Sequence, residues 1–341
     1  VGILKEKMTS SASNEIEKAS NDNFRVLYIC SAARCGSTLT DMFIGGHSQA
    51  TSLGEINFLE RAIGLNEECS CGEKLRNCPQ WNKIFDNIRL SRNIDLIKNP
   101  NAFKLWDILA YNKIDQQQTQ SYRMAVFLRK AWMMTRDHLP DVLRELTPIP
   151  PELNKALNNK MDLYRAIAQC WNKSVIVDSS KNFREAIELH RRWPDNIKVI
   201  LLTRDGRGVY LSRRSSGHSQ FDSVNIWLSY YRRALPLLSS HIASRSLLKI
   251  RYEDLASDPD ATGRILCNFA DIPFESGMLE LKQATRHLVS GNKTRFASGK
   301  EIRLDTRWQT DFSGAEIGFF TGTGGEINNQ LGYRWCFIQI K

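Results

Sequence analysis

Short apolar runs alternate with longer amphipathic stretches along most of the chain. The runs are FRVLYIC at 24–30, SVIVD at 174–178, NIKVILLT at 196–203 and LLKIRY at 247–252. Near-continuous apolar strands separated by helices are typical of a parallel sheet that is covered on both faces. The pattern therefore predicts an α/β protein with a central parallel sheet flanked by helices.

Apolar residues recur at three- and four-residue spacing in the longer stretches, which predicts amphipathic helices over 121–146, 151–172 and 222–244. The first two lie between the first and second predicted strands. We therefore expect a single domain over 24–340 with a helical insertion at 82–170 that covers the pocket. Residues 1–23 are polar and rich in Ser and Asn, and we expect them to form a flexible segment.

Composition narrows the class of ligand. The chain has 341 residues, of which 47 are Lys or Arg and 37 are Asp or Glu, so its formal charge of +10 favours anionic ligands. The basic residues form neither a lysine-rich tail nor a stripe interleaved with stacking aromatics, which argues against nucleic acid as a partner. No run approaches the ~20 apolar residues of a membrane span. We expect a soluble, cytoplasmic protein, although the chain as given is compatible with an upstream anchor or a larger parent chain.

Three of the eight cysteines cluster in the sequence CSCGEKLRNCPQW, as Cys69, Cys71 and Cys78. A long chain with a sizeable core does not require disulfides, so reduced thiols are the default for the others. A structural zinc ion needs four ligands, and only three are local here. The sequence therefore favours a cysteine-rich turn or a disulfide over zinc.

The first predicted strand runs into the loop SAARCGSTLTD at 31–41, which contains Arg34, Cys35, Gly36, Ser37 and Thr38. A strand, small residues and a helix N-terminus together form an anion-binding cradle. The loop is not a Walker A motif, because Ser37 rather than lysine follows the second glycine position. An ordinary strand-to-helix turn is the alternative interpretation.

A second candidate anion site follows the third predicted strand, in LLTRDGRGVYLSRRSSG. Arg204 stands at the strand end, and Ser212 lies about two turns into the next helix. The carboxyl edge of a parallel sheet is where such folds bind ligands, so this pair could hold a phosphate. The alternative is a charged turn with Asp205 near a helix N-terminus.

Together, the two motifs resemble the nucleotide-binding signatures of sulfotransferases that use 3′-phosphoadenosine 5′-phosphosulfate (PAPS). Two further stretches, KIRYEDLASDP and LGYRW, are also similar to short sequence motifs that are common in that family. The likeness spans about residues 24 to 336. The resemblance implies a P-loop-like sulfotransferase fold. It also implies that the loop at 34–38 holds the 5′-phosphosulfate, and that Arg204 and Ser212 hold the 3′-phosphate.

The resemblance also implies catalytic roles. HSQATSLGEINFLER at 47–61 is similar to the tyrosylprotein-type pattern, which makes Glu55 the expected general base. Arg34 and Lys181 are expected to stabilise the charge on the leaving group. Arg295 and Arg307 correspond loosely to the basic C-terminal loop that closes over the nucleotide in this family.

The resemblance further implies an acceptor hydroxyl and no metal requirement. A glycan, a tyrosyl peptide, a lipid, a small alcohol or a carrier-tethered intermediate would each satisfy the chemistry. The sequence does not indicate the oligomeric state.

Two other functions are compatible with the sequence. A P-loop small-molecule kinase is suggested by Asp178, which ends an apolar strand as a metal-positioning Walker B aspartate does. The missing lysine after Gly36 counts against it. A catalytically silent nucleotide-binding module is the other alternative, but such a module would not need all five of Arg34, Glu55, Lys181, Arg204 and Ser212.

Overall fold

A five-stranded parallel sheet forms the centre of the computed structural model, which describes residues 23–107, 119–281, 285–296 and 302–334. The strands, within these residues, are β1 (Arg25–Cys30), β2 (Ala50–Ser52), β3 (Val175–Asp178), β4 (Ile197–Thr203) and β5 (Leu247–Arg251). Their order is β2-β3-β1-β4-β5, and every neighbouring pair is parallel. The prediction of an α/β protein with a central parallel sheet is therefore confirmed. The expected flexible segment, residues 1–23, lies outside the described residues except for Asn23.

Strand β1 occupies the middle of the sheet and is buried on both faces. Val26, Tyr28 and Cys30 pack into one hydrophobic core, whereas Leu27 and Ile29 pack into the other. Successive side chains of a strand point to opposite faces, so both sets must be apolar when helices cover both sides. This explains why the run FRVLYIC is continuous rather than alternating.

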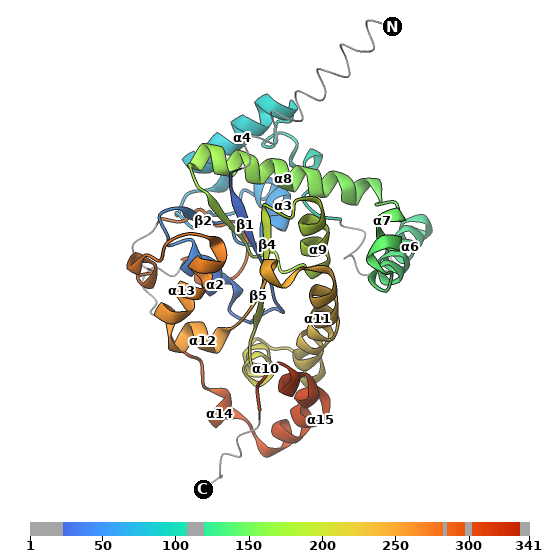
Figure 1. Ribbon diagram of the computed structural model, residues 1–341, viewed down its shortest axis with the longest axis vertical. Helices are drawn as coiled ribbons and strands as arrows, with labels where there is room; N and C mark the ends of the chain where they lie inside the picture. Colours follow the sequence, from blue (N-terminus) through green and yellow to red (C-terminus); the bar gives the residue numbers. More distant parts are fainter. Residues whose placement is uncertain (1–22, 108–118, 282–284, 297–301, 335–341) are drawn as a thin grey trace, which may run out of the picture.

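Helices cover both faces of the sheet (Figure 1). One face is covered by α2 (Ser37–Ile44), α12 (Tyr252–Ser257) and α13 (Pro259–Ala270). The other carries α9 (Phe183–Arg192) and α11 (Gln220–His241), while α8 (Pro151–Trp171) crosses one end of the sheet.

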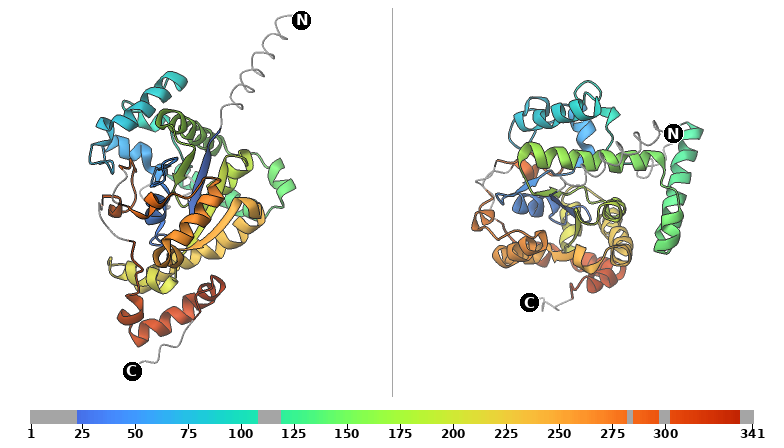
Figure 2. Two further views of the ribbon diagram at one scale, coloured as in Figure 1. Left: turned by 60° about the vertical axis from the view of Figure 1, so that its left-hand side comes forward. Right: turned by 45° about the horizontal axis from the view of Figure 1, so that its top comes forward.

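The interval between β2 and β3 is mainly helical in its described residues. It contains α3 (Leu59–Gly64), α4 (Pro79–Arg92), α6 (Gln120–Asp137), α7 (Asp141–Leu146) and α8. The stretch predicted as one helix over 121–146 is divided into α6 and α7 because Pro140 disfavours helical geometry at the residue before it. Figure 2 shows α6 at one edge of the molecule, beside the end of α8. The assignment of 82–170 as an insertion within a single domain stays a prediction.

The remaining helices lie toward the carboxyl end of the sheet (Figure 1). They are α10 (Gly206–Arg214), α14 (Trp308–Asp311) and α15 (Gly314–Gln330). Phe320 of α15 packs against Trp227 of α11 and Tyr210 of α10. Among the described residues, no helix is both long enough and apolar enough to cross a membrane.

Candidate functional site

The loop between β1 and α2 has the tight backbone that the sequence suggested. Arg34 has φ +69° and Gly36 has φ +90°, both in the left-handed region. A Cβ atom on Gly36 would lie 2.7 Å from Cδ2 of Tyr252, so glycine is required there for space as well as for conformation. Helix α2 begins at Ser37, which places its free backbone N–H groups at the loop.

The second motif lies against the first, although Arg204 follows Arg34 by 170 residues. The guanidinium of Arg204 donates to the backbone oxygen of Arg34 at 2.9 Å and lies 4.5 Å from the ring centroid of Tyr252. In return, the side chain of Arg34 donates to Oγ of Ser216, just beyond α10, at 3.2 Å. The two predicted anion-binding motifs therefore form one site at the carboxyl ends of β1 and β4.

A cavity of about 460 Å³ opens between these motifs. The residues that line it include Arg34, Gly36, Ser37, Thr38, Glu55, Lys181, Arg204, Ser212, Ser290, Gly291 and Asn292. The cavity thus combines four cationic side chains, those of Arg34, Arg61, Lys181 and Arg204, with a helix N-terminus. Such a combination favours a multiply charged anion.

Glu55 and Lys181 meet on the wall of this cavity. The ammonium of Lys181 contacts Oε1 of Glu55, and each side chain is about one-fifth exposed, at 19% and 20%. Lys181 has φ +69°, which is fixed by its N–H bond to the oxygen of Ile29 (3.2 Å) and by the hydroxyl of Tyr230, which donates to its carbonyl (2.7 Å). A non-glycine residue in this conformation persists only where the surroundings hold it.

Asp41 in α2 joins the two loops that carry this pair. Its Oδ2 accepts the N–H of Gly54 at 2.9 Å and the hydroxyl of Ser179 at 2.7 Å. Gly54 has φ +77° and directly precedes Glu55, whereas Ser179 stands two residues before Lys181. Burial raises the pKa of Asp41 to about 7. No pattern in the sequence marks Asp41, because one aspartate inside a helix carries no local signal.

A second cavity, of about 540 Å³, meets the first at the same pair. Glu55, Phe58 and Lys181 line both cavities. The rest of its wall includes Asn57, Trp106, Lys130, Met133, Met134, Phe183, Tyr230 and Arg233. Helix α6 supplies Lys130, Met133 and Met134, and so forms part of the wall.

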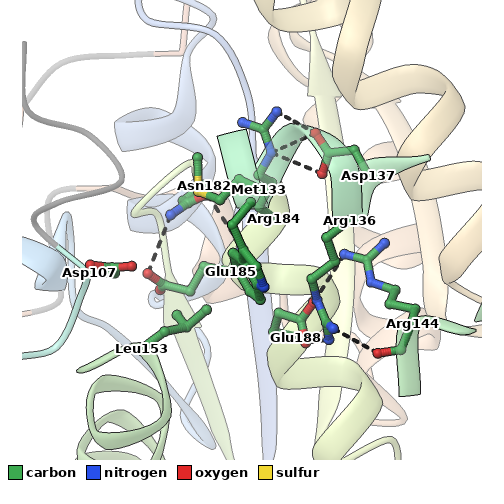
Figure 3. A pocket seen from close by; sticks show the side chains of 11 residues that line it. Asp107, Met133, Arg136, Asp137, Arg144, Leu153, Asn182, Arg184, Glu185 and Glu188 are labelled. Carbon is green, nitrogen blue, oxygen red and sulfur yellow. Dashed lines mark hydrogen bonds and ion pairs between the residues drawn. The ribbon is translucent and has the colours of Figure 1, made fainter. Parts of the chain in front are cut away.

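Buried ion pairs hold α6 and α7 to α9 (Figure 3). Arg136 of α6 and Arg144 of α7 each lie 3.0 Å from a carboxylate oxygen of Glu188 in α9. Burial opposes ionisation of Glu188, but the hydrogen bonds and charges of the two arginines lower its pKa overall. The cavity beside them measures about 30 Å³, which leaves room for about one or two water molecules. This region therefore links the three helices and is not a ligand site.

Three residues expected at the cofactor do not line either cavity. Cys35 is buried, and its thiol lies 3.4 Å from the hydroxyl of Tyr231; burial raises its pKa to about 12. Arg295 donates to the backbone oxygens of Gly291 and Glu68. Arg307 is paired with Asp305. Their assignment to the cofactor stays a prediction.

Asp305 is a second residue of the site that no sequence pattern marks. Its carboxylate accepts hydrogen bonds from Arg307 (2.8 Å) and from Arg204 (2.9 Å), which lower its pKa. The backbone N–H of Asp305 donates to the hydroxyl of Tyr252 at 3.2 Å. An internal carboxylate therefore already occupies part of the hydrogen-bonding capacity of Arg204.

Asp178, which suggested a kinase, points into the core. Its carboxylate accepts the hydroxyl of Tyr164 at 2.5 Å and lies 3.3 Å from the ammonium of Lys160, and all three side chains are fully buried. Asp178 lines neither cavity. The structure therefore offers no support for a metal-positioning role of this residue.

Comparison with known proteins gives one family. The model of the sulfotransferase family matches residues 27–276. A comparison with curated protein sequences gives no significant match.

Several solved structures are similar to this chain. The sulfotransferase domain of the Synechococcus PCC 7002 olefin synthase is 18% identical, with a TM-score of 0.50 over 92% of this chain and 96% of that domain. The sulfotransferase domain from the curacin biosynthetic pathway is also 18% identical, with a TM-score of 0.49 over 91% of this chain and 98% of that domain. Retinol dehydratase, solved in complex with androsterone and the inactive cofactor PAP, is 13% identical, with a TM-score of 0.40 over 92% of this chain and 84% of that chain. At 18% identity and a TM-score of 0.50, the likeness to the olefin synthase domain concerns the fold alone.

Proposed function

Because the chain belongs to the sulfotransferase family, we propose that it transfers a sulfuryl group from PAPS to the hydroxyl of an acceptor. The first cavity would hold the nucleotide and the second the acceptor. One observation carries this proposal: Glu55 and Lys181 line both cavities, so a base and a cation lie where the two ligands would meet.

The residues present suit PAPS. The cavity of about 460 Å³ lies within the range of about 300–1,000 Å³ that is typical of small-ligand sites. Arg34 and the N-terminus of α2 would bind the 5′-phosphosulfate, and Arg204 with Ser212 would bind the 3′-phosphate. When bound, PAPS supplies an activated sulfuryl group attached through oxygen to a good leaving group.

The roles of the protein side chains follow from the charges. An acceptor hydroxyl has a pKa far above neutrality, so a base must take its proton as the oxygen attacks sulfur. Glu55 is the carboxylate that lies between the cavities, and we assign it this role. Breaking of the old oxygen–sulfur bond, as the new one forms, would leave an electron pair on the departing phosphate oxygen. Lys181 and Arg34 stabilise that charge.

The second cavity suggests the character of the acceptor. Phe58, Trp106, Met133 and Met134 give it an apolar wall, while Lys130 and Arg233 add positive charge. An acceptor that has both an apolar body and a polar or anionic group would suit this lining. Glycans, tyrosyl peptides, lipids and small alcohols that carry such groups are the molecules to screen.

The first test is thermal stabilisation by 3′-phosphoadenosine 5′-phosphate (PAP), the product nucleotide. A ligand that binds only the native state raises the melting temperature by mass action. We expect a clear rise with PAP, and a smaller one with ADP, which lacks the 3′-phosphate that Arg204 and Ser212 would bind. ATP with magnesium serves as the comparison for the kinase alternative.

The outcomes separate the three candidate functions. Stabilisation by ATP with magnesium but not by PAP would overturn the proposal in favour of a kinase. A PAP-stabilised protein that transfers no labelled sulfate from PAPS to any class of hydroxyl acceptor would instead be a silent nucleotide-binding module. Transfer in the absence of added magnesium is the result that we expect.

A further inference from the structure

A cluster of three cysteines and one histidine lies outside both cavities. The sulfur atoms of Cys69, Cys71 and Cys78 and a ring nitrogen of His287 all lie within 4.8 Å of one another. Nδ1 of His287 is 3.2 Å from the sulfur of Cys78 and 3.8 Å from that of Cys69. The sulfur atoms of Cys71 and Cys78 are 3.7 Å apart.

These spacings suit a tetrahedral metal ion better than a disulfide. Zinc bonds of about 2.3 Å to sulfur and about 2.0–2.1 Å to nitrogen place tetrahedral ligand atoms about 3.5–3.8 Å apart. A disulfide needs its sulfur atoms about 2.05 Å apart, and all three cysteines are free thiols in the structure. We propose that Cys69, Cys71, Cys78 and His287 bind one structural Zn²⁺ ion.

The first two cysteines stand on a tight turn that presents them together. Gly72 has φ +93°, and its N–H donates to the backbone oxygen of Cys69 at 2.9 Å. The N–H of Cys69 donates to the backbone oxygen of Glu73 at 2.8 Å, which closes the turn. Cys78 directly precedes Pro79, the first residue of α4. Two ligands therefore come from a turn and the third from a helix start, and the backbone fixes all three positions.

The fourth ligand is held in place by its neighbours. The indole N–H of Trp81 donates to the backbone oxygen of His287 at 2.9 Å. Ser70, which lies between two of the cysteines, donates to the oxygen of Arg286 (2.7 Å) and accepts the N–H of Leu288 (2.8 Å). The cysteine turn and the histidine segment are thus aligned by hydrogen bonds on both sides of His287.

The ligand set indicates zinc and a structural role. Three thiolates and one imidazole are soft ligands that suit Zn²⁺ in a tetrahedral site. Four protein ligands fill that site and leave no open position for a water nucleophile or a substrate. Cys69 and Cys78 are fully buried, while Cys71 and His287 are partly exposed and give the ion a way in.

The metal would also support the wall of the cofactor cavity. Ser290 and Gly291, which line that cavity, follow His287 by three and four residues. A Cβ atom on Gly291 would lie 3.4 Å from Oε1 of Glu55, so this segment borders the proposed base. Loss of zinc should therefore loosen the site, even though the ion takes no part in the reaction. The zinc proposal does not depend on the proposed function.

The direct test is the metal content of the full chain, purified without chelator from cells supplied with zinc. We expect one zinc ion per chain, with loss of the metal in Cys78→Ser and in His287→Ala. Cys170→Ser and His218→Ala, which change a thiol and an imidazole outside the cluster, serve as matched controls and should retain it. Replacement by Co²⁺ should give the visible absorption bands of a tetrahedral, sulfur-ligated ion.

A second measurement covers the case in which the variants fail to fold. In the wild-type protein, alkylation of Cys71 should be slow, and it should become faster after treatment with a strong chelator; the rate at Cys170 should stay the same. Chelation should also lower the melting temperature, and Zn²⁺ but not Mg²⁺ should restore it. A wild-type chain without zinc, a Cys71–Cys78 disulfide in the purified protein, or a His287→Ala variant that retains one zinc ion would each overturn the proposal.

Discussion

Glu55 reaches the junction of the two cavities because the residue before it is held in an unusual conformation. Gly54 has φ +77°, and a Cβ atom there would lie 2.5 Å from the backbone oxygen of Val289. Asp41 binds the N–H of Gly54, and Lys181 contacts the carboxylate of Glu55. The position of one side chain thus depends on a glycine, a buried carboxylate and a cation.

Replacement of Glu55 by glutamine tests the proposed base. The amide has nearly the same size but cannot accept the proton, so we expect turnover to fall by about 100-fold or more. Stabilisation by PAP should be nearly unchanged, because Glu55 provides no positive charge to the nucleotide. Glu326→Gln, on the exposed surface of α15, is the control for a general effect of the substitution. Unchanged turnover in Glu55→Gln would remove this residue from the mechanism.

The raised pKa of Asp41 predicts an unusual dependence of stability on pH. Burial raises its pKa from 3.8 to about 7, so between these values the folded chain binds a proton that the unfolded chain releases. This contribution to stability is complete below about pH 4 and is lost as the pH rises through about 7. At about 1.4 kcal/mol per pKa unit, the change amounts to a few kcal/mol.

Asp41→Asn should abolish that dependence. Urea unfolding across this pH range should show that the wild type loses free energy of unfolding relative to the variant as the pH rises. Asp86→Asn, which changes an exposed aspartate on α4, should leave the pH profile unchanged. Parallel curves for Asp41→Asn and the wild type would show that Asp41 does not titrate in this range.

At the level of elements, the predicted strands were confirmed. Strands β1, β3 and β4 are apolar runs that are largely buried on both faces, whereas β5, at the sheet edge, is only partly buried. The run NIKVILLT at 196–203 corresponds to β4, Ile197–Thr203. By contrast, β2 contains only Ala50, Thr51 and Ser52, which carry no periodic signal. This strand forms at the sheet edge because it pairs with β3, and such long-range pairing cannot be read from three residues.

The buried ion pairs that link α6 and α7 to α9 lead to a prediction at the level of elements. Glu188→Gln leaves Arg136 and Arg144 buried without their counter-charge, and breaking a buried pair costs about 3–5 kcal/mol. We expect the free energy of unfolding to fall by that amount. Because α6 contributes to the second cavity, the KM for the acceptor should also rise, while binding of PAP should change little.

Glu152→Gln is the matched control for Glu188→Gln. Glu152 pairs with Arg129 at 2.8 Å but is 62% exposed, and exposed pairs contribute about 0–1 kcal/mol. Urea unfolding of both variants measures the difference. An equal loss in the two variants would show that burial of the Glu188 pairs adds nothing to their strength.

At the scale of the molecule, the candidate site is assembled from segments that are far apart in the chain. The two motifs that are predicted to bind anions could be recognised because each is local: a strand, a loop and a helix. Their contact, and the position of Glu55, came from the family resemblance rather than from the residues alone. His287 follows Cys78 by 209 residues and Asp305 follows Arg204 by 101, so no local pattern connects either pair.

The contact between Asp305 and Arg204 leads to the last prediction. In the free protein the carboxylate of Asp305 binds Arg204 and Arg307, as the 3′-phosphate of PAP would be expected to bind Arg204. Asp305→Asn removes a competing negative charge, so we expect PAP to bind roughly tenfold more tightly, about 1.4 kcal/mol. Arg204→Ala should have the opposite effect and weaken binding by about 1.5–3 kcal/mol, the contribution of a charged hydrogen bond.

Calorimetric titration of both variants with PAP separates two roles for Asp305. Tighter binding in Asp305→Asn would show that the carboxylate competes with the nucleotide and must move when PAP binds. Weaker binding would show instead that Asp305 holds the guanidinium of Arg204 in the orientation that the phosphate needs. Affinity equal to that of the wild type in Arg204→Ala would contradict the assignment of the 3′-phosphate to Arg204, because the loss of a buried cation from the binding site cannot leave the affinity for a dianion unchanged.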